Sequence, residues 1–175
     1  MAAGAIDRRD FLFSRYGAET YAGTPPWAAA HARFVELCDR CGDCLKACPS
    51  GILVPGDGGF PRVDFARGAC TFCGDCARAC RPGALRATVD AAGGALAPWS
   101  LIAAIDDSCL ALRGIVCRVC EEQCDARAVR IRLAVGGGAA PAVEPALCTG
   151  CGACVAPCPA RAIAVRPIDG RKKGH

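Results

Sequence analysis

Sixteen cysteines lie in four groups along this chain of 175 residues. In three of the groups the cysteines follow the spacing C-x2-C-x2-C-x3-C. These groups are, in chain order, Cys38, Cys41, Cys44 and Cys48; Cys70, Cys73, Cys76 and Cys80; and Cys148, Cys151, Cys154 and Cys158. A looser group, the third in chain order, comprises Cys109, Cys117, Cys120 and Cys124. Cysteines that recur at short fixed spacing are candidate metal ligands, so the sequence predicts several metal centres.

The regular groups resemble the cysteine run of bacterial ferredoxins, which binds cubane [4Fe–4S] clusters. In two-cluster ferredoxins the first three cysteines of a run bind one cluster and the fourth binds the neighbouring cluster. The resemblance therefore implies four crossed ligand sets in this chain. The sets are Cys38, Cys41 and Cys44 with Cys80; Cys70, Cys73 and Cys76 with Cys48; Cys109, Cys117 and Cys120 with Cys158; and Cys148, Cys151 and Cys154 with Cys124.

Zinc and disulfides are the alternatives at this density of cysteine. A zinc ribbon takes four ligands from two C-x2-C pairs that a longer loop separates, whereas each regular run here has three evenly spaced cysteines and a fourth. Disulfides are rare in the reducing interior of a cell, where we expect this protein. Iron–sulfur clusters are therefore the favoured interpretation of the first, second and fourth groups.

The third group departs from the regular spacing. Seven residues, 110–116, separate its first two cysteines, and Asp125 occupies the place of the prolines Pro49 and Pro159 that follow the first and fourth groups. A longer loop can still return Cys109 to the same cluster, so we expect four [4Fe–4S] clusters in all. Two alternatives remain open: a three-iron cluster without Cys109, and a cluster that is more labile and more exposed than the other three.

Short elements must position these cysteines. The stretches between the cysteines have room for one or two helical turns, and an apolar pair follows the last cysteine of each group. Strands are predicted to begin at these pairs, at 52–54, 85–89, 129–135 and 163–165. Glycine-rich turns follow the first three, and returning strands are predicted at 61–65, 99–105 and 142–147. The pattern indicates one structural unit repeated four times.

The repeats predict an α+β fold of two tandem bacterial-type 2[4Fe–4S] ferredoxin modules with short hairpins and short helices, plus an N-terminal arm. We expect the arm and a helix at 1–36, the first two-cluster module at 37–101, the second at 102–167 and a basic tail at 168–175. Sequential pairing of the groups is favoured because neighbouring elements usually pack together. A nested pairing, first with fourth and second with third, is the alternative. Modules of this size often need metals, so the clusters are expected to contribute to folding.

The formal net charge of +4 counts every thiol as neutral. Four thiolates around an oxidised [4Fe–4S] core carry a charge of about −2, so four clusters would bring the protein to about −4. The formal charge is thus no argument for binding nucleic acid, and we expect no nucleic-acid partner. The basic stretch Arg171-Lys172-Lys173 is interpreted as a solvated end.

The N-terminal stretch Arg8-Arg9-Asp10-Phe11-Leu12 is similar to a twin-arginine export signal. Such a signal needs an apolar stretch of about 7–15 residues after it, but Ser14, Arg15 and Glu19 follow almost at once. A membrane span needs about 18 or more apolar residues, and no run of the sequence approaches that length. We therefore expect a cytoplasmic protein without a membrane span.

No set of Ser, His and Asp residues and no glycine-rich phosphate loop indicates an active site of the protein's own. We therefore expect an electron-transfer or accessory protein and not an enzyme. His31 and His175 have no partner at ligand spacing. Trp27 and Trp99 are interpreted as packing or interface residues.

Two local features add a closer resemblance. Arg8-Arg9 precedes Phe11-Leu12, and the run from Cys109 to Cys120 reads CLALRGIVCRVC. With the cysteine groups, these features resemble the NapF family, the ferredoxin-type accessory proteins of periplasmic nitrate reductases, over 7–165. The resemblance implies a cytoplasmic protein with four [4Fe–4S] clusters that assists maturation of the catalytic subunit NapA before export, by one-electron transfer from an unidentified redox donor. Two other functions remain open: an electron-transfer polyferredoxin subunit of a reductase or dehydrogenase complex, and a donor of iron or clusters.

Overall fold

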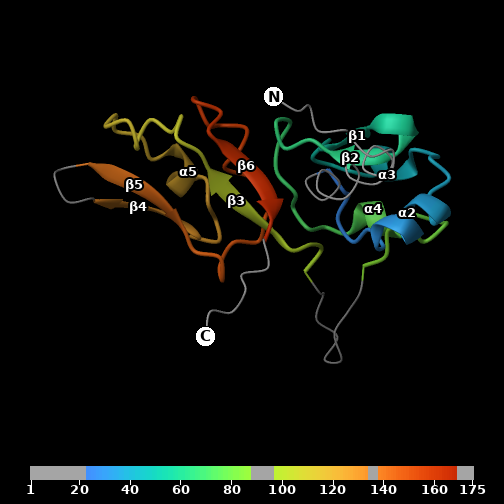
Figure 1. Ribbon diagram of the computed structural model, residues 1–175. Coiled ribbons are helices and arrows are strands. Elements are labelled where there is room, and N and C mark those ends of the chain that lie inside the picture. Colours follow the sequence, from blue (N-terminus) through green and yellow to red (C-terminus); the bar gives the residue numbers. More distant parts are fainter. Residues whose placement is uncertain (1–22, 88–96, 134–137, 169–175) are drawn as a thin grey trace, which may run out of the picture.

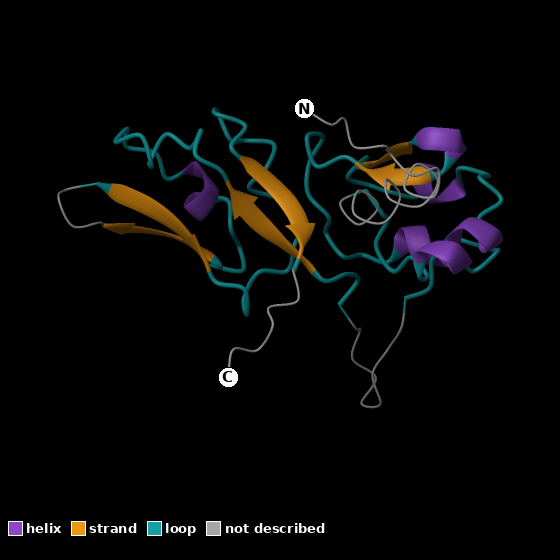
Figure 2. Ribbon diagram, in the orientation of Figure 1, coloured by secondary structure: helices purple, strands orange, loops and turns teal. Residues whose placement is uncertain are grey.

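The computed structural model describes residues 23–87, 97–133 and 138–168, which Figure 1 draws in colour. Residues 1–22 of the arm and helix expected at 1–36, with Arg8 and Arg9, lie outside the described residues, and so do residues 169–175 of the tail expected at 168–175. The described chain is a small mixture of helices and strands (Figure 2). The general prediction of a mixed helix-and-strand fold is confirmed.

Short helices and one hairpin build the first half of the molecule, which carries the first two cysteine groups. Its elements are α2 (His31–Leu37), α3 (Asp43–Lys46), β1 (Leu53–Pro55), the 3-10 helix η1 (Asp57–Gly59), β2 (Pro61–Val63) and α4 (Asp75–Arg78). β1 and β2 pair antiparallel, with Leu53 opposite Val63. Beyond α4, Leu85 forms an isolated antiparallel bridge with Ala28. The bridge joins the segment before the first cysteine group to the segment after the second.

Two strand pairs and one short helix build the second half, which carries the third and fourth groups. Its elements are β3 (Leu101–Ile105), α5 (Val119–Glu122), β4 (Val129–Leu133), β5 (Ala139–Val143) and β6 (Ile163–Pro167). β4 and β5 form a hairpin between the two cysteine groups, with Val129 opposite Val143. β3 pairs antiparallel with β6, with Ile105 opposite Ile163. The strand before the third group therefore lies beside the strand after the fourth (Figure 1).

The same turn follows the last cysteine of all four groups. The residue three positions after that cysteine has a positive φ, and its N–H donates to the carbonyl oxygen of the cysteine over 2.8–3.2 Å. These residues are Gly51, Gly83, Arg127 and Arg161. The next residue is at most 1 % exposed in each group, and these buried residues are Ile52, Ala84, Ala128 and Ala162. The turn thus places the first residue of each following segment in the core, which explains why apolar pairs recur there.

Three strand predictions need correction. The returning strand predicted at 99–105 begins at Leu101 and pairs with β6, because this pairing buries Leu101 and Ala103 together with residues of β6. The strand predicted at 85–89 is thereby left without its expected partner and is reduced, within the described residues, to the bridge at Leu85. The strand predicted at 142–147 lies at Ala139–Val143 instead. After it, the N–H groups of Leu147 and Cys148 bond to the carbonyl oxygen of Glu144 in a turn.

One hydrophobic core extends across both halves. It contains Ile52 of the first half together with Leu101 of β3 and Val165 of β6. A smaller cluster surrounds Val129 in the second half and includes Ala103. Because Leu101 belongs to the larger cluster and Ala103 to the smaller one, β3 connects the two cores.

Candidate metal centres

Four cavities in the structure are each lined by four cysteines. The first cavity is lined by Cys38, Cys41, Cys44 and Cys80; the second by Cys48, Cys70, Cys73 and Cys76; the third by Cys109, Cys117, Cys120 and Cys158; and the fourth by Cys124, Cys148, Cys151 and Cys154. Each cavity combines three cysteines of one group with the last cysteine of another. All sixteen candidate ligands are gathered in these four places.

The cavities suit a group that is bound by several ligands at once, because each cavity, the third included, is lined by four thiols from two cysteine groups. Within the described residues, which include every cysteine, no three His, Cys, Asp or Glu side chains lie close enough to hold a single ion. All sixteen thiols are free. Four separated thiols around a shared cavity fit a cubane cluster, in which each thiolate binds a different iron atom.

The loops between the cysteines depend on residues with positive φ. In three groups the residue before the second cysteine has a φ of +56° to +69°, and these residues are Arg40, Phe72 and Gly150. The residue after that cysteine is a glycine with a φ of +76° to +79°, namely Gly42, Gly74 and Gly152. The chain then enters α3 and α4, where Cys44 and Cys76 are buried. The sequence prediction did not include these glycines, although their equivalent position in three groups is a signal that identifies them.

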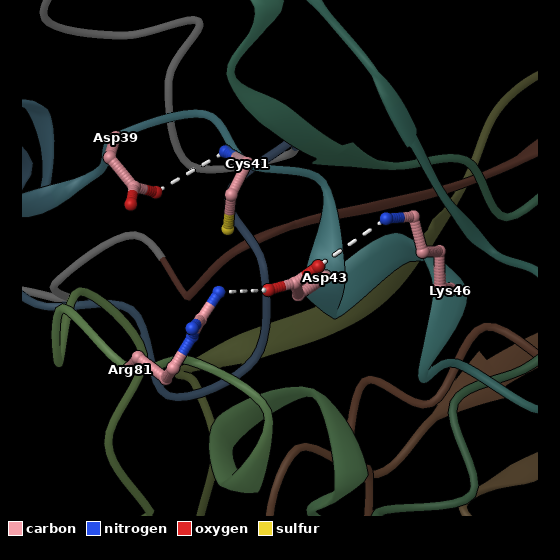
Figure 3. Close-up of polar contacts among 5 residues, drawn as sticks. All are labelled: Asp39, Cys41, Asp43, Lys46 and Arg81. Atoms are coloured by element: carbon pink, nitrogen blue, oxygen red, sulfur yellow. Dashed lines mark hydrogen bonds and ion pairs between the residues drawn. The ribbon is translucent and has the colours of Figure 1, made fainter.

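The last cysteine of the second group reaches the first cavity through the turn after α4. Next to it, the guanidinium of Arg81 forms an ion pair with Asp43 at 3.2 Å, and Asp43 also accepts from Lys46 at 3.4 Å (Figure 3). In the loop of the first cysteine group, before α3, the backbone N–H of Cys41 donates to the carboxylate of Asp39 at 3.2 Å. Hydrogen bonds from Lys46 and then from Arg81 lower the pKa of Asp43. The ion pair links the first and second groups, but because it is solvent-exposed it contributes little to stability.

Backbone N–H groups donate to several cysteine sulfur atoms. The pairs are Leu85 to Cys80 (3.3 Å), Ala128 to Cys124 (3.2 Å), Ala162 to Cys158 (3.4 Å) and Ala103 to Cys148 (3.5 Å). Such donors stabilise negative charge on the sulfur atoms, so they favour the reduced state of a bound cluster. Three of the four donors follow the turn that is repeated after each group, which connects the repeated fold to the redox properties of the sites.

Burial raises the pKa of several thiols. It raises the pKa of Cys76 and Cys154 to about 12 and the pKa of Cys44 and Cys70 to about 11, and neighbouring thiols add to the effect. These thiols are therefore protonated at neutral pH in the metal-free protein. Iron binding must displace their protons, and the positive charge of the metal stabilises the resulting thiolates.

The longer loop of the third group folds back and returns Cys117 to the third cavity. Backbone hydrogen bonds join Ile115 to Leu110 at 2.9 Å and Gly114 to Ala111 at 3.1 Å. The side chain of Ala111 is buried beneath the loop. The extra residues thus form a compact turn in place of the two residues that separate these cysteines in the other groups.

The third cavity is not the most exposed of the four. Cys109 is buried and lines the cavity. The other cysteines of this set, all in the described part of the chain, are buried or half-buried. In contrast, Cys41 of the first cavity and Cys73 of the second are exposed. The cysteines of the third cavity are therefore no more exposed than those of the first and second cavities.

In the third group, the residue after the second cysteine is an arginine that forms an ion pair, whereas the other groups have a glycine at this position. Arg118 follows the second cysteine with a φ of −131°, and its guanidinium lies 2.7 Å from the carboxylate of Glu121. Glu121 also accepts the backbone N–H of Ile131 in β4 at 3.3 Å. The hydrogen bond from Arg118, followed by that from Ile131, lowers the pKa of Glu121. The charged carboxylate therefore clamps α5 to β4 beside the third cavity.

Of the remaining candidate residues, one tryptophan lies beside a cavity. Trp27 is buried in the larger core and also lines the second cavity, whereas His31 is exposed at the start of α2. Trp99 packs against Phe65 and Phe72. His175 lies outside the described residues. Across the described ranges, we find no helix with the length and apolar character that crossing a membrane requires.

Two stretches of the chain match models of iron–sulfur families. Residues 30–85 match the 4Fe-4S dicluster domain, and residues 141–164 match the 4Fe-4S binding domain. The third cysteine group, which departs from the regular spacing, lies between the two matched stretches. The matches and the cysteines together establish that the chain binds [4Fe–4S] clusters.

Relatives resemble the chain over most of its length. A Haemophilus influenzae protein named ferredoxin-type protein NapF is 40 % identical over 96 % of this chain and 98 % of its own length. An Escherichia coli protein of the same name is 36 % identical over 89 % of this chain and 92 % of its own length. A Methanosarcina acetivorans protein, named as one subunit of an ion-translocating oxidoreductase complex, is 36 % identical over 74 % of this chain but only 47 % of its own length. The chain is therefore an iron–sulfur electron-transfer protein that belongs to the NapF family of ferredoxin-type proteins.

Proposed function

We propose that the chain binds four [4Fe–4S] clusters, one in each cavity, with the four lining cysteines of that cavity as ligands. The observation that carries the proposal is the same combination in all four places: three cysteines of one group and the last cysteine of another. The position of Cys109 on the wall of the third cavity supports a four-iron cluster there as well.

The bound clusters supply one-electron chemistry, and residues of the chain set how readily each cluster is reduced. N–H donors such as Ala128 and Ala162 stabilise charge on the ligand sulfur atoms. Burial of Cys76 and Cys154 has the opposite effect, because it disfavours added negative charge. The balance of these two influences differs from cavity to cavity, which supports sites of different reduction potential.

Cys109→Ser tests the ligand sets at the third cavity. The substitution removes a thiol that lines this cavity and no other. We therefore expect the iron and acid-labile sulfide content of the protein to fall by the amount that one cluster contains. Ser108→Ala is the matched control, since Ser108 is adjacent but its side chain bonds to Asp106. A Cys109→Ser protein that keeps all of its iron would show that Cys109 is not a ligand.

The protein acts, on this proposal, in the cytoplasm on the nitrate reductase catalytic subunit NapA before NapA is exported, and it passes single electrons that the maturation of NapA needs. Its relatives named NapF, at 36 % and 40 % identity over most of the chain, support this role. A protein with several one-electron sites suits a process that delivers electrons one at a time.

An exposed apolar loop beside the third cavity offers a surface for the partner. Val116, Ile115 and Leu112 are 93 %, 53 % and 47 % exposed, and their loop lies on the side of the second half away from the first half (Figure 1). Grouped exposed apolar side chains mark protein contacts. We expect Val116→Asp to weaken co-purification of NapA without loss of iron. Leu133→Asp is the matched control, because Leu133 is 89 % exposed at the end of β4.

A strain that lacks the protein tests the maturation role itself. We expect exported NapA from this strain to have less iron and less activity, above all when growth is iron-poor. Equal NapA activity with and without the protein, in both iron-poor and iron-replete cells, would overturn the maturation role and leave the cluster assignment intact.

One observation favours a second candidate function, that of an electron-transfer subunit in a larger complex. The Methanosarcina acetivorans relative is named as a subunit of an ion-translocating oxidoreductase complex. This chain spans about half the length of that relative, however, and nearly the whole length of the NapF relatives. A complex subunit would be reduced and reoxidised during turnover while NapA assembled normally in its absence.

A further inference from the structure

The second and fourth cysteine groups meet where the two halves of the molecule join. The backbone N–H of Cys70 donates to the carbonyl oxygen of Cys151 at 2.8 Å. Cys70 lines the second cavity and Cys151 lines the fourth. A backbone hydrogen bond between two lining residues places these two cavities side by side, although their cysteine groups are not neighbours in the sequence.

Aromatic rings hold this junction together. Trp99 packs edge-on against Phe65 and Phe72 of the first half, with ring centroids 5.8 and 6.2 Å apart. The indole Nε1–H of Trp99 donates to the carbonyl oxygen of Thr149 at 3.0 Å. Thr149 follows Cys148 in the fourth group. Trp99 therefore ties the first half directly to the cysteine loop of the fourth cavity.

Glycines allow the fourth loop to approach this closely. A Cβ atom at Gly152 would overlap the ring of Phe65, and one at Gly150 would lie 2.7 Å from the carbonyl oxygen of Leu101. Both glycines have positive φ. The loop is therefore in contact with the first half on one side and with β3 on the other, and it has no room for side chains at these positions.

The spatial order of the cavities follows from these contacts. The first and second cavities exchange Cys80 and Cys48, and the third and fourth exchange Cys158 and Cys124. The junction adds a link between the second and the fourth. The order in space is therefore first, second, fourth, third, so the first and third cavities are the two ends.

We propose that Trp99, Phe65 and Gly152 are positioning residues that hold the second and fourth cavities against each other, so that electrons pass between the two halves at this point. The inference rests on the proposed function, with a cluster in every cavity. With [4Fe–4S] clusters held by the lining cysteines of these two cavities, one electron would leave the reduced site and be accepted by the oxidised site. No bond breaks and no proton moves. Because electron tunnelling falls steeply with distance, a loosened junction isolates the halves from each other.

Electron paramagnetic resonance of the fully reduced holoprotein tests this inference, because neighbouring reduced clusters broaden each other's signals. We expect Trp99→Ala and Phe65→Ala to keep the iron of all four clusters. The broadening that the clusters of the second and fourth cavities cause in each other should be lost, whereas the broadening between the two clusters of the same half should remain. Phe60→Ala is the matched control. Its ring packs against Phe34 within the first half, with centroids 6.1 Å apart, and we expect its spectrum to be that of the wild type.

Trp99→Phe decides the outcome if the alanine variants lose iron. It keeps an aromatic ring but removes the donor to Thr149, so we expect full iron and a partial loss of the broadening. Unchanged broadening in iron-replete Trp99→Ala or Trp99→Phe would overturn the inference, and so would an equal change in Phe60→Ala. Iron for fewer than four clusters in the wild type would instead refute the proposed cluster number, so the two failures are distinguishable.

Discussion

At the scale of single residues, the cysteines carry the chemistry, but the glycines beside them determine the geometry of the loops. Gly42, Gly74 and Gly152 follow the second cysteine of their groups with positive φ, a conformation that strains residues with a Cβ atom. The third group has Arg118 at this position and uses its ion pair with Glu121 instead. Ligand chemistry can therefore be predicted from cysteine spacing, whereas the role of each glycine depends on what the fold places next to it.

Gly42→Ala and Gly152→Ala form a matched pair that separates backbone strain from packing. A Cβ atom at Gly42 would meet nothing within 4 Å, so we expect a cost of about 1–2 kcal/mol from strain. At Gly152 the Cβ atom would also overlap Phe65, which adds about 1–3 kcal/mol. Thermal unfolding without oxygen, followed by the visible absorbance of the clusters, should give the lower midpoint for Gly152→Ala. Equal midpoints would show that the loop is not held against Phe65.

At the scale of the elements, the sequence predicts the kinds of element better than their partners. Short helices between cysteines and strands after them follow from local spacing and apolar residues. The pairing of β3 with β6 does not follow from local spacing. The alternating apolar residues of a strand determine which of its faces is buried, but they do not determine which strand pairs with it. Proximity along the chain favours 85–89 as the partner of β3, whereas its actual partner lies after the fourth group.

Glu121→Gln tests the clamp between α5 and β4. The neutral amide loses the charge-assisted bond to Arg118, so we expect the third cluster to be lost faster than the other three during exposure to a chelator. Glu122→Gln is the control, because Glu122 is an exposed residue of the same helix. Iron release followed over time, with the resonance signals identifying the cluster that is lost, measures the difference. Equal rates in the two variants would contradict a protective role for the clamp.

The effect of Glu121→Gln is also expected to depend on pH. The hydrogen bond from Arg118 lowers the pKa of Glu121 below its ordinary value of 4.5, so the charge stabilises the folded protein above that value. The stabilisation is lost as the pH falls below 4.5 and through the lowered pKa. The wild type and the variant should therefore differ at neutral pH and converge in acid. A difference in iron release that stays constant as the pH falls would show that the charge is not responsible.

At the scale of the whole molecule, the aliphatic core is small and the metal sites are many. Among the described residues, the largest fully buried side chains are Ile52 and Val129. The [4Fe–4S] chemistry could be predicted from cysteine spacing and the family from the resemblance of two local features, the Arg8-Arg9 segment and the run 109–120, and the family models and relatives confirm both. The contact between the second and fourth groups could not be predicted from the sequence. It depends on where Trp99 packs and on the space beside Gly150, and neither of these produces a periodic pattern in the sequence.

Removal of iron is expected to unfold the second half before the first. Most buried residues of the larger core, including the aromatic residues Trp27 and Phe34, belong to the first half, whereas the smaller clusters around Val129 and Ala111 belong to the second half. Metal binding therefore supplies a larger share of the folding free energy in the second half. During stepwise chelation, hydrogen–deuterium exchange should release the amides of β4 and β5 before those of β1 and β2. The reverse order, or full protection of both hairpins after all iron is gone, would contradict this division of stability.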